Sequence, residues 1–83
     1  MTVEEMKARI EAMAPGTEAQ VTDMTGGQDH FQVLVVSPAF EGKKLLEQQK
    51  MVQATLDKEI QSGEVHALTM RTYTPEQYEK TKG

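Results

Sequence analysis

The two histidines are the side chains best suited to chemistry, because each stands directly before an apolar run that predicts a β-strand. His30 precedes the run FQVLVV, and His66 precedes the run ALTM. Imidazole nitrogen is a common ligand for zinc, copper and iron. If the two strands are parallel neighbours, both rings lie at one edge of the sheet and form a paired site for a soft metal.

Two imidazoles cannot complete a closed four-ligand zinc site by themselves. The chain has no cysteine, so it also lacks thiolate ligands, thiolate nucleophiles and disulfides. A metal site at the histidine pair would therefore take its remaining ligands from a second molecule. The alternative is that each histidine is a hydrogen-bonded residue at the rim of a strand.

Other reactive side chains do not form a recognisable catalytic motif. Ser37 and Ser62 have no adjacent base in an activating motif. Asp29 beside His30 fits a turn better than a catalytic triad. No His-Glu-x-x-His motif is present, and the Gly26-Gly27 pair is too short for a phosphate-binding loop. We therefore predict a protein that is not an enzyme.

The length and composition are those of one small globular domain spanning residues 1–83, with 37% hydrophobic and 27% charged residues. No segment approaches the roughly 18 apolar residues that cross a bilayer, and no signal-peptide segment is evident. We therefore expect a cytoplasmic protein without membrane contact. The net charge of −4 disfavours a protein whose main task is to neutralise phosphates.

Turn residues and apolar spacing predict the order helix, strand, strand, helix, strand, helix. Thr2 and Glu5 form a capping-box signature for a first helix that ends near Met13. A weakly alternating edge strand at 18–25 and a turn at 26–29 follow. The next strand has apolar residues in succession, which is typical of a central strand covered on at least part of both faces.

A short helical turn and then one long helix, which starts after Gly42 and runs to about Gln61, are predicted to follow the central strand. The predicted apolar stripe of the long helix consists of Leu45, Val52, Leu56 and Ile60. Gln49 falls on the same stripe, which predicts an amide at the edge of the core.

The third strand is predicted at 65–73, and Thr74 with Gln77 caps a final helix. A strand–helix–strand connection of this length favours a right-handed crossover between parallel strands. Neighbouring strands lie about 4.8 Å apart, so His30 and His66 would then converge. If the first strand lay between them, the two rings would be separated.

Several short segments in the same order resemble the BolA family. They are DHFQV at 29–33, VVS at 35–37 with Phe40, Gly42-Lys43, VHAL at 65–68 and TYTPE at 72–76. The resemblance spans nearly the whole chain, and within the family the chain is similar to the short bacterial IbaG-like type. It implies an α+β, class II KH-like (BolA-like) single domain with a three-stranded mixed sheet.

The resemblance also implies a partner and a cofactor. Such proteins are monomers that form a heterodimer with a cytosolic monothiol glutaredoxin, and the pair shares a [2Fe-2S] cluster. Glutaredoxin and glutathione each supply a thiolate, and the BolA-like chain supplies the remaining ligands. Mixed histidine and thiolate ligation is known for this cluster type.

Within this resemblance, His66 matches the C-terminal ligand histidine of the family. The second family ligand lies in the loop between the first two strands, where this chain has only residues 26–29, and His30 is the nearest substitute. The implied function is an accessory role in iron–sulfur cluster assembly and trafficking and in iron or stress regulation.

The alternative function is DNA-binding transcriptional regulation, with which the family is also associated. A KH-like fold places residues 40–44 near the turn that holds a nucleic-acid backbone in KH domains. Glu41 and Glu47 interrupt this basic patch, and the net charge opposes phosphate binding. The residues expected to contact phosphates in this alternative are Lys43, Lys44, Lys50 and Arg71.

Overall fold

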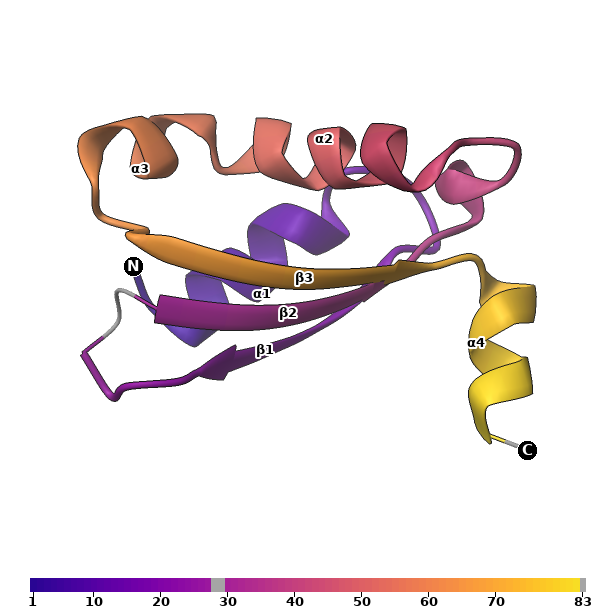
Figure 1. Cartoon of the computed structure of the whole chain (residues 1–83), viewed down its shortest axis with the longest axis horizontal. Coiled ribbons are helices and arrows are strands. Elements are labelled where there is room, and N and C mark those ends of the chain that lie inside the picture. Colours follow the sequence, from indigo (N-terminus) through magenta and orange to yellow (C-terminus); the bar gives the residue numbers. More distant parts are fainter. Residues whose placement is uncertain (28–29, 83) are drawn as a thin grey trace.

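The computed structural model describes residues 1–27 and 30–82, and one sheet carries helices mainly on one face (Figure 1). Residues 28–29 of the expected turn, Asp29 among them, lie outside the described residues. None of the helices in the described part is long and apolar enough to cross a bilayer. The elements are α1 (Val3–Glu11), β1 (Glu18–Asp23), β2 (His30–Val36), the 3₁₀ turn η1 (Pro38–Phe40), α2 (Leu45–Thr55), α3 (Asp57–Ser62), β3 (Ala67–Tyr73) and α4 (Pro75–Lys82).

The strand order is β1-β2-β3, with β1 antiparallel and β3 parallel to the central strand β2. This arrangement confirms the expected α+β architecture with a three-stranded mixed sheet. The helices α2 and α3 form the crossover between the parallel strands. Because β1 lies on the other side of β2, it does not separate the starts of β2 and β3.

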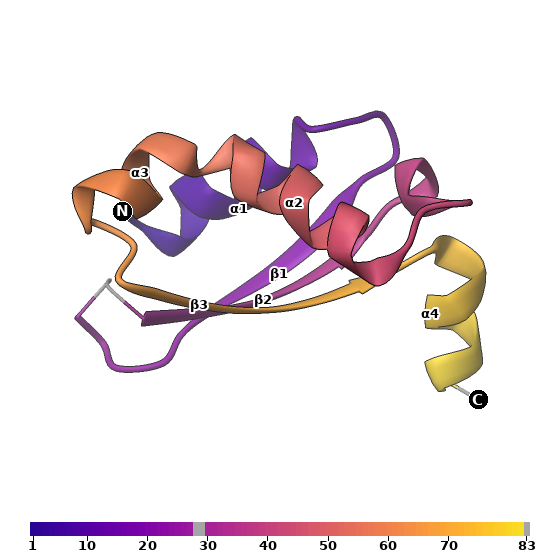
Figure 2. The ribbon, with the colours of Figure 1, turned by 45° about the horizontal axis from the view of Figure 1, so that its top comes forward.

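The core lies between the sheet and the helices α1, α2 and α3, which cover the same face (Figure 2). Phe31, Val33 and Val35 alternate along β2 toward these helices and are fully buried. On the opposite face, Leu34 is half-buried and Val36 is buried beside α4. The prediction that both faces of the central strand are partly covered is thus confirmed. On the face away from α1, α2 and α3, the cover is greatest near α4.

Both expected helix caps are present. Thr2 Oγ1 accepts a hydrogen bond from the Glu5 N–H at 3.1 Å, and this caps α1. Thr74 and Gln77 form a reciprocal box before α4: the Gln77 N–H donates to Thr74 Oγ1 at 3.2 Å, and the Thr74 N–H donates to Gln77 Oε1 at 3.0 Å. These local bonds satisfy backbone donors that a helix leaves unpaired at its start.

The expected single helix to Gln61 is wrong, because the helix breaks at Leu56, whose φ of −121° and ψ of 16° are not helical. The Thr55 hydroxyl donates to the Val52 carbonyl at 2.7 Å, and the Leu56 N–H donates to the Gln53 carbonyl at 3.0 Å. Such local bonds compete with the regular helical pattern. The break keeps Leu56 fully buried while α3 starts in a new direction.

The predicted apolar stripe is also corrected, because the buried amide is Gln48 rather than Gln49. Gln48 is 6% exposed and Gln49 is half-buried, while Leu45 is 59% exposed. Gln48 Nε2 donates to the carbonyls of Phe40 and Lys43, at 3.3 and 2.9 Å. Val52 and Leu56 of the predicted stripe are fully buried, whereas Leu45 and Ile60 are exposed. Gln48 takes the core-facing place expected for Gln49, and its amide satisfies the two loop carbonyls.

Candidate metal-binding site

The rings of His30 and His66 lie side by side at the start of the two parallel strands. The register pairs His30 with Ala67, so His66 stands one residue before the partner of His30. The ring centroids are 5.4 Å apart and the ring planes are inclined by 70°. The His66 side chain is exposed and that of His30 is half-buried. The predicted convergence of the two histidines is therefore confirmed.

A tight connection from α3 to β3 positions His66. Gly63 ends α3 with a φ of +85°, a conformation that glycine adopts without strain. The Val65 N–H then donates to the Glu59 carbonyl at 3.0 Å, and the Val65 side chain is buried. Because Val65 is anchored in the core, the next side chain, His66, is placed at the surface beside β2.

The end of the β1–β2 hairpin positions His30. The Met24 N–H donates to the His30 carbonyl at 2.9 Å, which extends the pairing of the two strands by one residue. Asp23 Oδ1 accepts hydrogen bonds from the N–H groups of Thr25 and Gly26, at 3.3 and 3.0 Å. This side-chain turn fixes the direction in which the chain leaves β1.

The spacing of the two rings suits a shared metal atom. Two imidazoles that bind one tetrahedral ion through bonds of about 2.0–2.1 Å have ring centroids about 5 Å apart. The observed 5.4 Å is close to this value, and the 70° inclination of the ring planes makes the contact between His30 and His66 an edge contact. Within residues 1–27 and 30–82, no three His, Cys, Asp or Glu side chains form a metal-binding group.

The residues of the alternative nucleic-acid interface are not all on one surface. Lys43 and Lys44 are exposed just before α2, and Lys50 is exposed on α2. Arg71 is exposed on β3, opposite Leu34 in the register, and so lies on the sheet face away from α2. The three lysines therefore belong to the helical layer, and Arg71 does not.

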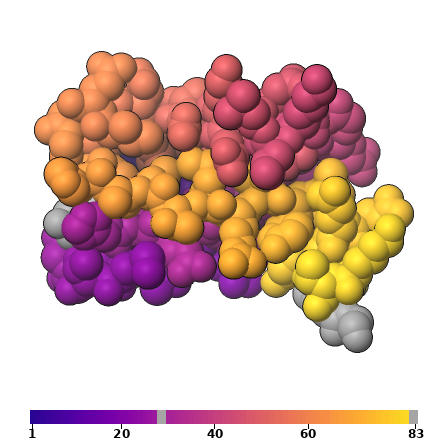
Figure 3. Space-filling view, in the orientation of Figure 1, coloured from indigo at the N-terminus to yellow at the C-terminus, as the bar shows by residue number. Residues whose placement is uncertain are grey.

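The loop that carries Lys43 and Lys44 before α2, here called the lysine loop, lies at the opposite end of the sheet from the histidine pair. The strands β2 and β3 begin near α3, whereas α2 begins near the other end, beside α4 (Figure 1). In the space-filling view, β3 runs along the surface between these two ends (Figure 3). Ligands at the two candidate sites would therefore not compete for the same space.

Comparison with known proteins identifies the family. The family model described as BolA-like protein matches residues 5–77. The chain belongs to this family. Protein BOLA2 of Arabidopsis thaliana is 39% identical over 80 residues, which cover 94% of this chain and 84% of the relative. The DNA-binding transcriptional regulator BolA of Escherichia coli strain K12 is 41% identical over 54 residues, which cover 65% of this chain and 50% of the relative.

Solved BolA-like structures confirm the fold. The crystal structure of a bol-like protein from Babesia bovis aligns with a TM-score of 0.85 and 31% sequence identity. The alignment covers 100% of this chain and 95% of that structure. The BolA-like fold expected from the sequence is therefore the fold observed.

A positioning residue of this BolA-like chain that the sequence analysis missed is Gln48. Besides its two bonds to the loop before α2, its Oε1 accepts a hydrogen bond from the Thr72 hydroxyl at 2.7 Å. Gln48 therefore links the lysine loop to β3. The signal in the sequence was the i, i+4 spacing of Gln48 to Val52.

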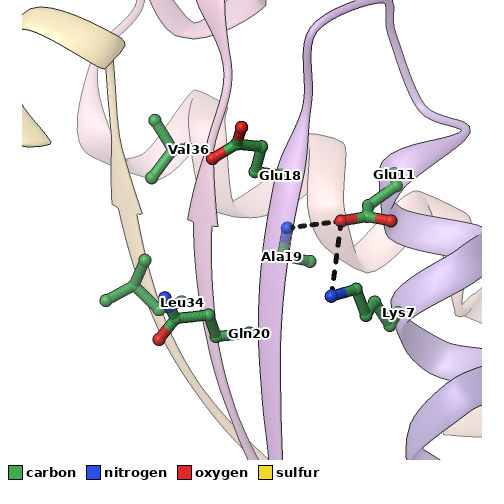
Figure 4. A pocket seen from close by; sticks show the side chains of 7 residues that line it. All are labelled: Lys7, Glu11, Glu18, Ala19, Gln20, Leu34 and Val36. Carbon is green, nitrogen blue, oxygen red and sulfur yellow. Dashed lines mark hydrogen bonds and ion pairs between the residues drawn. The ribbon is translucent and has the colours of Figure 1, made fainter.

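A hollow beside the outer edge of β1 is less suitable as a binding site than the histidine pair in this BolA-like fold (Figure 4). Glu11 Oε2 accepts a hydrogen bond from the Ala19 N–H at 3.1 Å and lies 3.9 Å from Lys7 Nζ. The carboxylate thus protects the edge of the sheet and is already paired. The residues lining the hollow are Lys7, Glu11, Glu18, Ala19, Gln20, Leu34 and Val36.

Proposed function

We propose that this BolA-like chain is an accessory protein that binds a monothiol glutaredoxin and shares a [2Fe-2S] cluster with it in the cytoplasm. The observation that carries this proposal is the 5.4 Å spacing of the His30 and His66 rings at an accessible end of the sheet. The chain alone is a monomer and catalyses no reaction. It acts in cluster assembly and trafficking and thereby in iron or stress regulation.

The donor set of this chain fits such a cluster. The chain contains no cysteine, so both thiolates come from glutaredoxin and glutathione. In clusters with mixed ligands, two histidines replace two cysteines on one of the two irons and raise the reduction potential. The spacing of His30 and His66 suits two ligands of one metal atom, which supports this division of ligands.

His66 is the principal ligand in this proposal and His30 the second. The His66 side chain is exposed and follows a short turn, so an iron atom held by a partner can approach it. His30, whose ring is half-buried, lies at the start of β2, where its backbone is paired with β3. A cluster seated here would lie across the starts of β2 and β3.

The test is to mix the chain with glutaredoxin that carries a cluster and glutathione, and to follow visible absorption and circular dichroism. The wild-type chain is expected to change both spectra, and His66→Ala to abolish the change. Lys50→Ala, an exposed change on α2, is the control and leaves the response intact. Unchanged spectra with the wild type, or a full response with His66→Ala, would refute the proposal.

The second candidate function is DNA-binding transcriptional regulation. It is supported by the name of the Escherichia coli relative and by the exposed lysines before α2. Binding to duplex DNA should then weaken with added salt, because phosphate contacts release counterions. The paired change Lys43→Glu and Lys44→Glu should abolish it. An absent or salt-independent signal would eliminate this candidate.

A further inference from the structure

Met24 lies across the β1–β2 hairpin from His30. The β1–β2 register pairs Asp23 with Phe31, so Met24 is the next residue opposite His30. Their pairing is supported by the hydrogen bond from the Met24 N–H to the His30 carbonyl at 2.9 Å. Directly opposed residues of antiparallel strands have Cβ atoms about 4.5–5.5 Å apart on one face of the sheet. The flexible Met24 side chain can therefore bring its sulfur to the His30 ring.

Within residues 1–27 and 30–82, Met24 neither belongs to the hydrophobic core nor packs against it. Its side chain is 58% exposed, among the most exposed of the large apolar residues. The remaining five of the six methionines belong to the core or pack against it; these are Met1, Met6, Met13, Met51 and Met70. A thioether is a weak ligand for hard ions and a good ligand for Cu(I).

We propose that Met24, His30 and His66 bind one Cu(I) ion in the chain alone, through two imidazole nitrogens and one thioether sulfur. Imidazole suits copper, and thioether sulfur selects its monovalent form. The 5.4 Å spacing of the rings fits two ligands of one ion, and Met24 lies opposite one of them. The three donors come from the hairpin end and from the start of β3, so no partner is needed.

This site goes beyond the proposed cluster function because it requires neither glutaredoxin nor glutathione. Both functions use His66 and His30, so Cu(I) bound at the pair would exclude an iron–sulfur cluster from it. Met24 distinguishes copper binding from cluster binding, because thiolates from the partner already supply sulfur to the cluster. A change at Met24 should therefore affect copper binding alone.

The test is an anaerobic titration of the chain with Cu(I) in competition with a chromogenic Cu(I) chelator. Wild type is expected to bind one equivalent, and Met24→Leu to lower the Cu(I) affinity by at least about tenfold. Met51→Leu, which changes a methionine packed against the core, is the matched control and keeps the affinity. X-ray absorption should detect copper–sulfur scattering in wild type and none in Met24→Leu.

Wild-type affinity or retained copper–sulfur scattering in Met24→Leu would overturn the copper proposal, and so would the failure of wild type to compete with the chelator. Zinc affinity should be unchanged in Met24→Leu, because zinc sites use nitrogen, oxygen and thiolate ligands. An equal loss of zinc and Cu(I) affinity would contradict the role of the sulfur. The glutaredoxin spectra of Met24→Leu should equal those of wild type, so failure of one proposal is distinguishable from failure of the other.

Discussion

The rings of His30 and His66 lie 5.4 Å apart, although two helices separate the two residues in the sequence. The parallel pairing of β2 with β3 creates this proximity, because it brings the starts of both strands to one edge of the sheet. A cysteine-free chain thereby acquires two metal ligands that its fold holds together.

Loss of the Gln48 amide should destabilise the fold. Gln48→Leu leaves the carbonyls of Phe40 and Lys43 and the buried Thr72 hydroxyl without their partner. We expect the free energy of unfolding in urea to fall by about 2–4 kcal/mol. Gln49→Leu, a change at the half-buried neighbour, should cost about 0.5 kcal/mol or less. Equal costs for the two variants would contradict this account.

The Arg9 pair with Glu59 should matter more than the Lys7 pair with Glu11. The Glu59 side chain is only 11% exposed, so Arg9→Met leaves a largely buried carboxylate without its ion pair. We expect a loss of about 2–4 kcal/mol in urea denaturation. Lys7 is 52% exposed, and Lys7→Met should cost less than about 1 kcal/mol. The reverse order of the two costs would show that the buried pair is not important for stability.

Two glycines with positive φ should respond differently to alanine. Gly63→Ala meets no atom within 4 Å and should cost about 1 kcal/mol from its φ of +85° alone. Gly16→Ala has a similar φ of +79°, and its Cβ would also lie 3.2 Å from Pro38 Cγ, so it should cost more. Thermal unfolding of both variants measures this difference, and a smaller cost at Gly16 would contradict it.

Changes at the two ends of the sheet should be functionally independent. The double variant Lys43→Glu and Lys44→Glu should leave the glutaredoxin cluster spectra unchanged, because α2 and β3 begin at opposite ends of the sheet (Figure 1). If DNA is bound, replacing a single lysine by alanine should lower the slope of log affinity against log salt by about 1. Altered cluster spectra in the lysine variant would show that the two ends are coupled.

The sequence predicted those parts of the site that depend on local signals and on connection length. The capping residue Thr2, the edge and central strands, and the parallel crossover that unites His30 and His66 all follow from such signals. The register of the sheet then places both rings. The strand order, which the sequence left open, decides that β1 does not lie between the two histidines.

The features that sequence reasoning missed depend on contacts between distant residues. The break at Leu56 keeps that side chain in the core, and Gln48 is buried because it pairs with Thr72 on β3. Periodicity alone could not choose between Gln48 and Gln49, which lie one position apart on the helix. Arg71 likewise resembles the lysines in charge, but strand alternation places it on the other face.

The most direct test of the cluster proposal is pulsed EPR of the reduced cluster shared by ¹⁵N-histidine-labelled chain and unlabelled glutaredoxin. We predict ¹⁵N hyperfine couplings from two histidines of this chain, and none in His66→Ala, because that variant no longer shares the cluster. A cluster with no nitrogen coupling from the labelled chain would contradict the proposal that His66 and His30 bind its iron.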